Sequence, residues 1–165
     1  MNDNSVDRVQ RIQKNPMFQE LYMKLQDAEK SRIFCKHTME HFLDVARLMY
    51  IFCLEDSENI RKDVIYATAL LHDLGRYEQI TFGTPHNVAG VEIAGNILIE
   101  CGFTENEIRS IQNAIASHRE PHGVDADKLT TYLYRADKMS RNCFSCAARS
   151  ECNWPDEKKN EWIIS

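Results

Sequence analysis

Glycine and proline are scarce in this chain of 165 residues, which contains only six Gly and four Pro. Turn-rich β folds use many of both residues, so their scarcity favours helices. No segment alternates apolar and polar residues with the period of two that marks a half-buried strand. We therefore expect an all-α fold, a bundle of five to seven helices that forms one domain over residues 1–165.

The sequence also lacks an apolar run of the roughly 18–20 residues that a transmembrane helix needs. Its first residues, MNDNSVDRVQ, place no apolar stretch behind a basic start and do not resemble a signal peptide. We expect a cytoplasmic protein with no membrane partner, in which thiols stay reduced. Basic residues are not in excess either, since the formal net charge is −5. This balance disfavours a nucleic-acid polymer as partner.

Apolar residues recur at helical spacing through most of the chain. The helix starts include Pro16, Pro85 preceded by Thr84, and a capping box from Thr104 to Glu107. Gly75 and Gly102 are natural stops. The segment RYEQITFG, residues 76–83, is expected to be a loop. The expected helices are 16–30, 36–54, 57–73, 85–101, 104–118, 127–141 and a short one near 155–163.

Several polar side chains continue the apolar stripes of these helices and should point inward. They are His41, His72, His86, His118 and Asp137. One inward histidine alone is more often a core residue that is bonded to a backbone carbonyl. Buried carboxylates, however, need a positive partner. No Lys or Arg obviously accompanies the stripes, so a shared metal centre explains the whole set.

Five segments carry a family resemblance, in this order along the chain: HFLDVARL from His41, ALLHDLGR, PHNVAG, IASH and YRADK. Together they resemble the HD superfamily of metal-dependent phosphohydrolases, over roughly residues 35–140. The most specific element is the His72-Asp73 pair at the end of an apolar helix, combined with an upstream His and a downstream Asp preceded by Ala. The resemblance implies an HD-domain helical bundle.

The resemblance also implies a ligand set. His41, His72, Asp73 and Asp137 would hold one metal ion. In addition, His86 and His118 look like the extra histidines of binuclear members, with Asp73 bridging both ions. Such donors suit divalent Fe, Mn, Co, Ni or Zn. Two ions about 3.5–4 Å apart can lower the pKa of a bridging water and polarise phosphoryl oxygens, so no Ser or Cys nucleophile is required. His72 and Asp73 are therefore expected to be catalytic.

Neighbouring residues leave alternatives open. His37 lies one turn before His41 and is an alternative ligand, a substrate contact or simply a polar neighbour. Arg76 and Lys138 are expected to bind the substrate phosphate, although Arg76 could equally be a solvated surface residue. Arg141 could present positive charge in the same way. His122, in a Pro-Gly loop, is expected to be a bystander.

Three cysteines follow the helix of Asp137 in the pattern C-x2-C-x5-C: Cys143, Cys146 and Cys152. Their spacing suits a tetrahedral ion with Cys35 as the fourth ligand. We expect a structural zinc site that ties a C-terminal extension, residues 143–165, to the domain. An iron–sulfur cluster and three ordinary thiols are the alternatives. Cys53 and Cys101 lie in apolar helix stretches and are expected to be core thiols.

The leading functional prediction is a phosphohydrolase that acts on a nucleotide or a similar small phosphorylated compound. The residues after His72-Asp73 lack the Gly-Tyr-Pro element of cyclic-dinucleotide enzymes, which weakens that substrate class. A diiron oxygenase would use the same six ligands, and a non-catalytic metal or redox sensor is a third possibility. The sequence does not determine the oligomeric state or the identity of the substrate.

Overall fold

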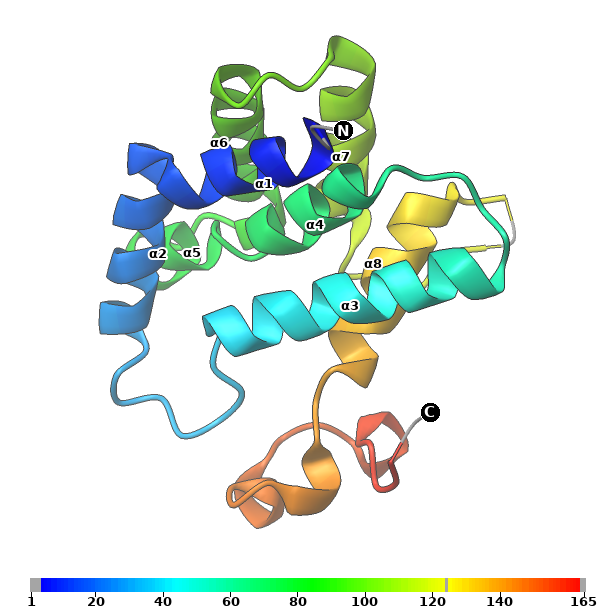
Figure 1. Ribbon diagram of the computed structural model, residues 1–165. Helices are drawn as coiled ribbons and strands as arrows, with labels where there is room; N and C mark the ends of the chain where they lie inside the picture. Colours follow the sequence, from blue (N-terminus) through cyan, green and yellow to red (C-terminus); the bar gives the residue numbers. More distant parts are fainter. Residues whose placement is uncertain (1–3, 124, 164–165) are drawn as a thin grey trace.

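Eight α helices account for most of the structure, a computed structural model that describes residues 4–123 and 125–163 (Figure 1). They are α1 (Asn4–Lys14), α2 (Pro16–Ala28), α3 (Met39–Glu55), α4 (Lys62–Leu71), α5 (Arg76–Phe82), α6 (His86–Glu100), α7 (Glu105–Ser117) and α8 (Lys128–Met139). The described residues contain no strand. The expected all-α fold is thus confirmed. In this part of the chain, no helix combines the length and the apolar character needed to cross a bilayer.

Several predicted helix boundaries follow the capping chemistry of the sequence, but two do not: Pro85 and not Thr84 is the N-cap of α6, and Gly75 precedes α5 instead of ending α4. Pro16 opens α2 at its first turn, and the side chain of Asn15 accepts a hydrogen bond from the Phe18 amide. The capping box of Thr104 and Glu107 opens α7, with both of its reciprocal hydrogen bonds present. Gly102 closes the preceding turn with a φ of 81°, a left-handed conformation that favours glycine.

Two helices differ from the sequence expectation, and they raise the count above the five to seven expected. α1 is largely polar in sequence, and its anchor is a long-range ionic contact. Arg8 Nε donates to Asp63 Oδ2 at 2.7 Å, and Arg8 Nη1 donates to Glu107 Oε2 at 2.8 Å. Periodicity cannot reveal contacts of this kind. α5 replaces the expected loop at 76–83; it buries no residue and ends at Gly83, whose φ is 78°.

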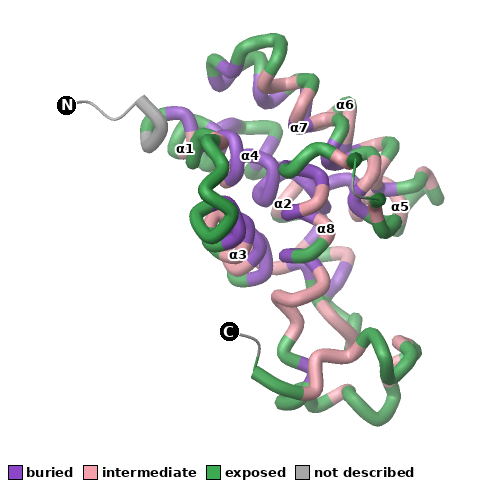
Figure 2. The backbone as a smooth tube through the Cα atoms, turned by 90° about the vertical axis from the view of Figure 1, so that its right-hand side faces the viewer, coloured by how far each residue is buried: buried purple, intermediate pink, exposed green. Residues whose placement is uncertain are grey.

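The core lies where α3 packs against α4 and α8 (Figure 2). Phe42, Val45 and Met49 on α3 are fully buried, as are Ile65 on α4 and Leu133 on α8. Burial of such side chains is worth about 1.5–3 kcal/mol each. α6 and α7 form an antiparallel pair that also contacts α4. The ends of α3, α6, α7 and α8 that carry the predicted ligands meet at the turn that follows α4.

After α8, the described residues 140–163 form only three short 3₁₀ turns, Cys143–Ser145, Arg149–Glu151 and Asp156–Lys158. The last of these stands where a short helix near 155–163 was expected. Asn160 joins the segment to the end of α8, because its Nδ2 donates to the carbonyl oxygens of Lys138 at 2.8 Å and Arg141 at 2.7 Å.

Gly75 is required by close packing and not by its backbone angles, since its φ is an ordinary −65°. A Cβ at this position would lie 2.1 Å from the His86 carbonyl oxygen and 2.8 Å from the Gly90 amide nitrogen. The absent side chain therefore lets α6 approach the turn that carries His72 and Asp73. Any larger residue must push the two segments apart.

We predict that Gly75→Ala destabilises the protein by at least about 1–3 kcal/mol, as overpacking does elsewhere. Gly123→Ala is the matched control, because a Cβ at that position would have no atom within 4 Å of it. Thermal melting of both variants measures the difference. Equal melting temperatures for the two variants would contradict the packing role of Gly75.

Candidate metal centre

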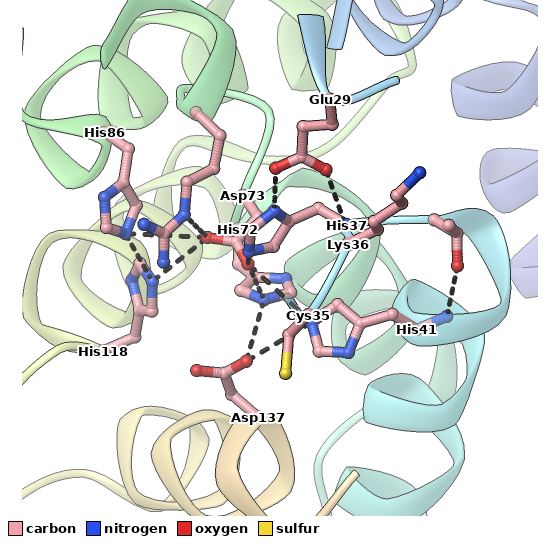
Figure 3. Close-up of polar contacts among 12 residues, drawn as sticks. Glu29, Cys35, Lys36, His37, His41, His72, Asp73, His86, His118 and Asp137 are labelled. Carbon is pink, nitrogen blue, oxygen red and sulfur yellow. Dashed lines mark hydrogen bonds and ion pairs between the residues drawn. The ribbon is translucent and has the colours of Figure 1, made fainter. Parts of the chain in front are cut away.

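Asp73 occupies the middle of a buried group of imidazoles and carboxylates (Figure 3). It lies in the turn between α4 and α5, directly after His72, which ends α4. His72 is fully buried and Asp73 is only 1% exposed. Helices from opposite sides direct the other members toward this carboxylate. Its two oxygen atoms face different neighbours.

The Oδ2 side of Asp73 meets side chains from α3, α4 and α8. His72 Nε2 lies 3.0 Å and His41 Nε2 lies 3.8 Å from Oδ2. Asp137 Oδ1 completes the group at 3.4 Å from His41 Nε2 and 3.7 Å from His72 Nε2. Donor atoms of these four residues all lie within 4.8 Å of one another, a separation that one metal ion could bridge.

The Oδ1 side of Asp73 meets α6 and the end of α7. His86 Nε2 and His118 Nε2 each lie 3.6 Å from Oδ1 and 3.2 Å from one another. These donor atoms also lie within 4.8 Å of one another. The structure therefore brings together all six residues predicted as ligands, in two groups that share Asp73.

Each of these imidazoles has its second nitrogen occupied by an oxygen of the protein. A backbone carbonyl can only accept, so it keeps a hydrogen on Nδ1 and leaves Nε2 as the nitrogen that faces the centre. This arrangement is typical of metal-binding histidines. The pairs are His72 Nδ1 with Ala69 O, His118 Nδ1 with Ile115 O and His86 Nδ1 with Gln79 Oε1, all at 2.7 Å, and His41 Nδ1 with Ser140 Oγ at 3.2 Å.

Two atoms in the middle of the centre have no hydrogen bond. His72 Nε2 and Asp73 Oδ2 are completely buried and lie 3.0 Å apart, yet their orientation does not form a hydrogen bond. A buried polar atom without a partner is energetically unfavourable. A cation between them would satisfy both atoms. The residues present therefore fit a divalent metal ion.

His37 joins the centre from the loop before α3, and not from the same helix face as His41. Its Nε2 lies 3.5 Å from Asp73 Oδ2. Its Nδ1 lies 2.6 Å from Glu29 Oε1, and its backbone amide donates to Glu29 Oε2 at 2.8 Å. Glu29, at 2% exposure, was not predicted from the sequence. A negative charge at the C-terminal end of a helix is unfavourable with the helix dipole. The position of Glu29 was therefore the available sequence signal that this carboxylate has a partner.

No Lys or Arg was expected along the helix stripes, but two cations reach the carboxylates from outside them. Arg76 Nε donates to Asp73 Oδ1 at 3.0 Å, and Lys138 Nζ donates to Asp137 Oδ2 at 2.9 Å. Helical periodicity reveals only cations on the same helix stripes, whereas both of these cations lie at the edge of the centre. They line a cavity of about 280 Å³ that opens onto Asp137. His122 packs against Tyr134 and belongs to neither group of donors.

The histidines of the centre differ in pKa. Burial opposes a charge on His72, but Asp73 and Asp137 outweigh burial and raise the pKa of His72 to about 10. Burial lowers the pKa of His86 to about 3, with a smaller opposing effect from Asp73. For Asp73 and Asp137, burial opposes the charge, but the imidazoles around them hold both pKa values well below the ordinary value. His72 is thus protonated and His86 neutral at pH 7 in the metal-free protein.

The cysteines fall into two groups. Cys53 and Cys101 are buried in the hydrophobic core, at 1% and 2% exposure. The other four are free thiols beside the metal centre. Cys35, Cys143 and Cys146 line one cavity, and Cys35 and Cys152 line the cavity that opens onto Asp137.

Comparisons with known proteins agree with this architecture. The family described as "HD domain" matches residues 38–142. A protein of Clostridium beijerinckii, described as "Uncharacterized protein", is 47% identical over 132 residues, which cover 80% of this chain and 82% of the relative. A crystal structure described as a "predicted HD superfamily hydrolase" from an uncultured Thermotogales bacterium has a TM-score of 0.58 at 22% identity. It covers 86% of this chain and 80% of its own, and it shares the fold.

We predict that metal binding at the His72 side of Asp73 releases about one proton per ion at pH 8. His72 holds a proton up to a pKa of about 10, and a ligand must be deprotonated to bind. The affinity should therefore rise about tenfold per pH unit between pH 7 and 9. Titration calorimetry in buffers of different ionisation enthalpy measures the protons released. No proton release and an affinity independent of pH would contradict the assignment.

Proposed function

Since the chain belongs to the HD domain family, we propose that it is a metal-dependent phosphohydrolase. Its substrate would be a phosphoester or phosphoanhydride of a nucleotide or another small phosphorylated compound. The observation that carries this proposal is the division of the Asp73 carboxylate. Oδ2 faces His72 and His41, while Oδ1 faces His86 and His118.

A carboxylate that faces two sets of imidazoles is suited to bridge two cations. His41, His72, Asp73 and Asp137 would hold the first ion, and Asp73, His86 and His118 the second. Two divalent ions supply Lewis acidity and a nucleophile derived from water at neutral pH. The mixed donors suit Fe, Mn, Co, Ni or Zn. Water is thus the attacking group in this proposal, and the reaction requires no covalent intermediate on the protein.

The surroundings of the centre favour an anionic substrate. Four cationic side chains line the cavity of about 280 Å³ beside Asp137: Arg32, Arg76, Lys138 and Arg141. The chain as a whole carries a net charge of −5, so this concentration of positive charge is local. Guanidinium and ammonium groups bind phosphate oxygens by charge-assisted hydrogen bonds. In this proposal Arg76 and Lys138 bind and orient the phosphate, as expected from the sequence.

The lining of the same cavity favours a small substrate with an aromatic part. Phe34 and Trp154 line it together with the cationic residues, and an aromatic ring offers a flat apolar surface to a nucleobase. Its volume lies near the lower limit for ligand pockets, which argues against a large polymer. A nucleotide therefore fits both the charge and the apolar part of the cavity.

We predict that Asp73→Ala removes both metal ions and lowers phosphate release by at least ~100-fold. Loss of a residue that only orients a ligand already reduces metal affinity or activity by about 10–100-fold, and Asp73 serves both sites. The assay measures phosphate release from a panel of phosphorylated compounds, nucleotides included, with Mn or Fe added. Circular dichroism checks that the helices are retained.

His122→Ala is the matched control, because it removes an imidazole that lies outside the centre. This variant should keep the metal content and the activity of the parent. Undiminished phosphate release by Asp73→Ala would contradict the proposal. So would a parent protein that releases no phosphate but consumes oxygen with iron bound, since that result would assign the centre to an oxygenase.

A further inference from the structure

Four thiols gather beside the metal centre and take no part in it. Cys35 lies in the loop between α2 and α3, whereas Cys143, Cys146 and Cys152 follow α8. Cys35 lines both neighbouring cavities, the first with Cys143 and Cys146 and the second with Cys152. Burial raises the pKa of Cys35, Arg141 opposes the effect, and the other three thiols raise it further. The four side chains thus lie close enough to influence one another.

The C-terminal segment, residues 143–163, has almost no core of its own. Cys143 is the one buried residue in it, and Figure 2 shows the rest as exposed or half-buried. Large apolar side chains that could form a core face the solvent, with Phe144 at 43% and Trp162 at 83% exposure. Segments with so little apolar burial usually depend on a disulfide or a metal. No disulfide is present among the described cysteines.

The backbone of this segment turns at each cysteine. The Cys146 amide donates to the Cys143 carbonyl at 3.2 Å, the Arg149 amide to the Cys146 carbonyl at 3.2 Å, and the Cys152 amide to the Arg149 carbonyl at 3.4 Å. Three successive turns therefore keep the three thiols of the C-x2-C-x5-C pattern in a compact unit. Arg149 itself pairs with Glu161, which closes the far end of the segment.

The separation of the sulfur atoms favours a cluster over a single ion. A tetrahedral zinc ion with bonds of about 2.3 Å places its sulfur ligands only ~3.8 Å apart. Among the described residues, only the two groups at Asp73 bring three or more His, Cys, Asp or Glu donors within 4.8 Å of one another. No three of the four sulfur atoms are that close. Cys35, Cys143 and Cys146 line a cavity of about 240 Å³, and Cys35 and Cys152 line the neighbouring cavity of about 280 Å³.

We propose that Cys35, Cys143, Cys146 and Cys152 bind an iron–sulfur cluster that fastens the C-terminal segment to the loop before α3. Iron–sulfur clusters are held by four thiolates, and a polynuclear core separates its ligands more widely than one ion does. The thiols lose their protons on binding. Lys36 and Arg141, which line the cavity of about 240 Å³, offset the resulting negative charge. The zinc ion favoured by the sequence spacing alone fits this geometry less well.

The cluster would also support the substrate cavity. Cys152, Asn153 and Trp154 line the cavity that contains His37 and Asp137, so the segment forms one wall of it. The proposal does not depend on the phosphohydrolase reaction. The two proposals can fail independently. Retained sulfide reports only on the cluster, and phosphate release reports only on the Asp73 centre.

The test reconstitutes the full-length protein anaerobically with ferrous iron and inorganic sulfide. The parent should retain acid-labile sulfide after desalting and show the broad visible absorption of thiolate-bound iron. Cys146→Ala should lose both signals and melt roughly 5 °C lower or more. Cys146 is exposed, so its replacement in a segment without a cluster would change the melting temperature very little. Iron bound at Asp73 carries no sulfide and does not confuse the result.

Cys101→Ala is the matched control, because it removes a thiol that is buried in the core. It should retain the sulfide of the parent, whatever its effect on melting. A parent that retains no sulfide, that binds zinc at the four cysteines, or that forms a disulfide among them would overturn the proposal. Full sulfide retention by Cys146→Ala would overturn it as well. The sulfide content of the parent decides the question even if a variant does not fold.

Discussion

The carboxylate of Asp73 is the constraint on which the rest of the centre depends. It is buried among imidazoles that come from α3, α4, α6 and the end of α7. A charged group at this depth is stable only with compensating positive charge, which Arg76, His72 and bound cations can provide. The helices that surround it must therefore hold these groups close to the carboxylate. The close approach of α6 at Gly75 is one consequence of this requirement.

The fold holds the ligands by a second layer of contacts. Backbone carbonyls of Ala69 and Ile115 orient His72 and His118, and these contacts arise from the helix ends themselves. Side chains of Gln79 and Glu29 do the same for His86 and His37. α5, which buries none of its own residues, supplies Gln79 and Arg76. Its role in the structure is thus mainly the support of the centre, while Tyr77 packs against the edge of the core.

The sequence predicted the helical fold and the inward direction of five of the six central residues, because both follow from periodicity along single helices, whereas Asp73 was identified through the family resemblance. It did not predict contacts between distant segments. Glu29 contacts His37, which lies eight positions further along the chain, and Arg8 anchors α1 through Asp63 and Glu107. The sequence predicts a loop in place of α5, because seven residues carry too little periodicity. Sequence spacing likewise did not predict the distance between the cysteine thiols, because it gives the order of the ligands along the chain but not their separation in space.

A crystal structure of the protein grown with Mn or Fe, with anomalous scattering recorded at the metal edge, tests the central claim most directly. The account predicts two anomalous peaks about 3.5–4 Å apart, one beside each oxygen of Asp73. The first would lie among His41, His72 and Asp137, and the second between His86 and His118. A protein that shows no peak at Asp73 under saturating metal, or whose metal lies only at other residues, would contradict the account.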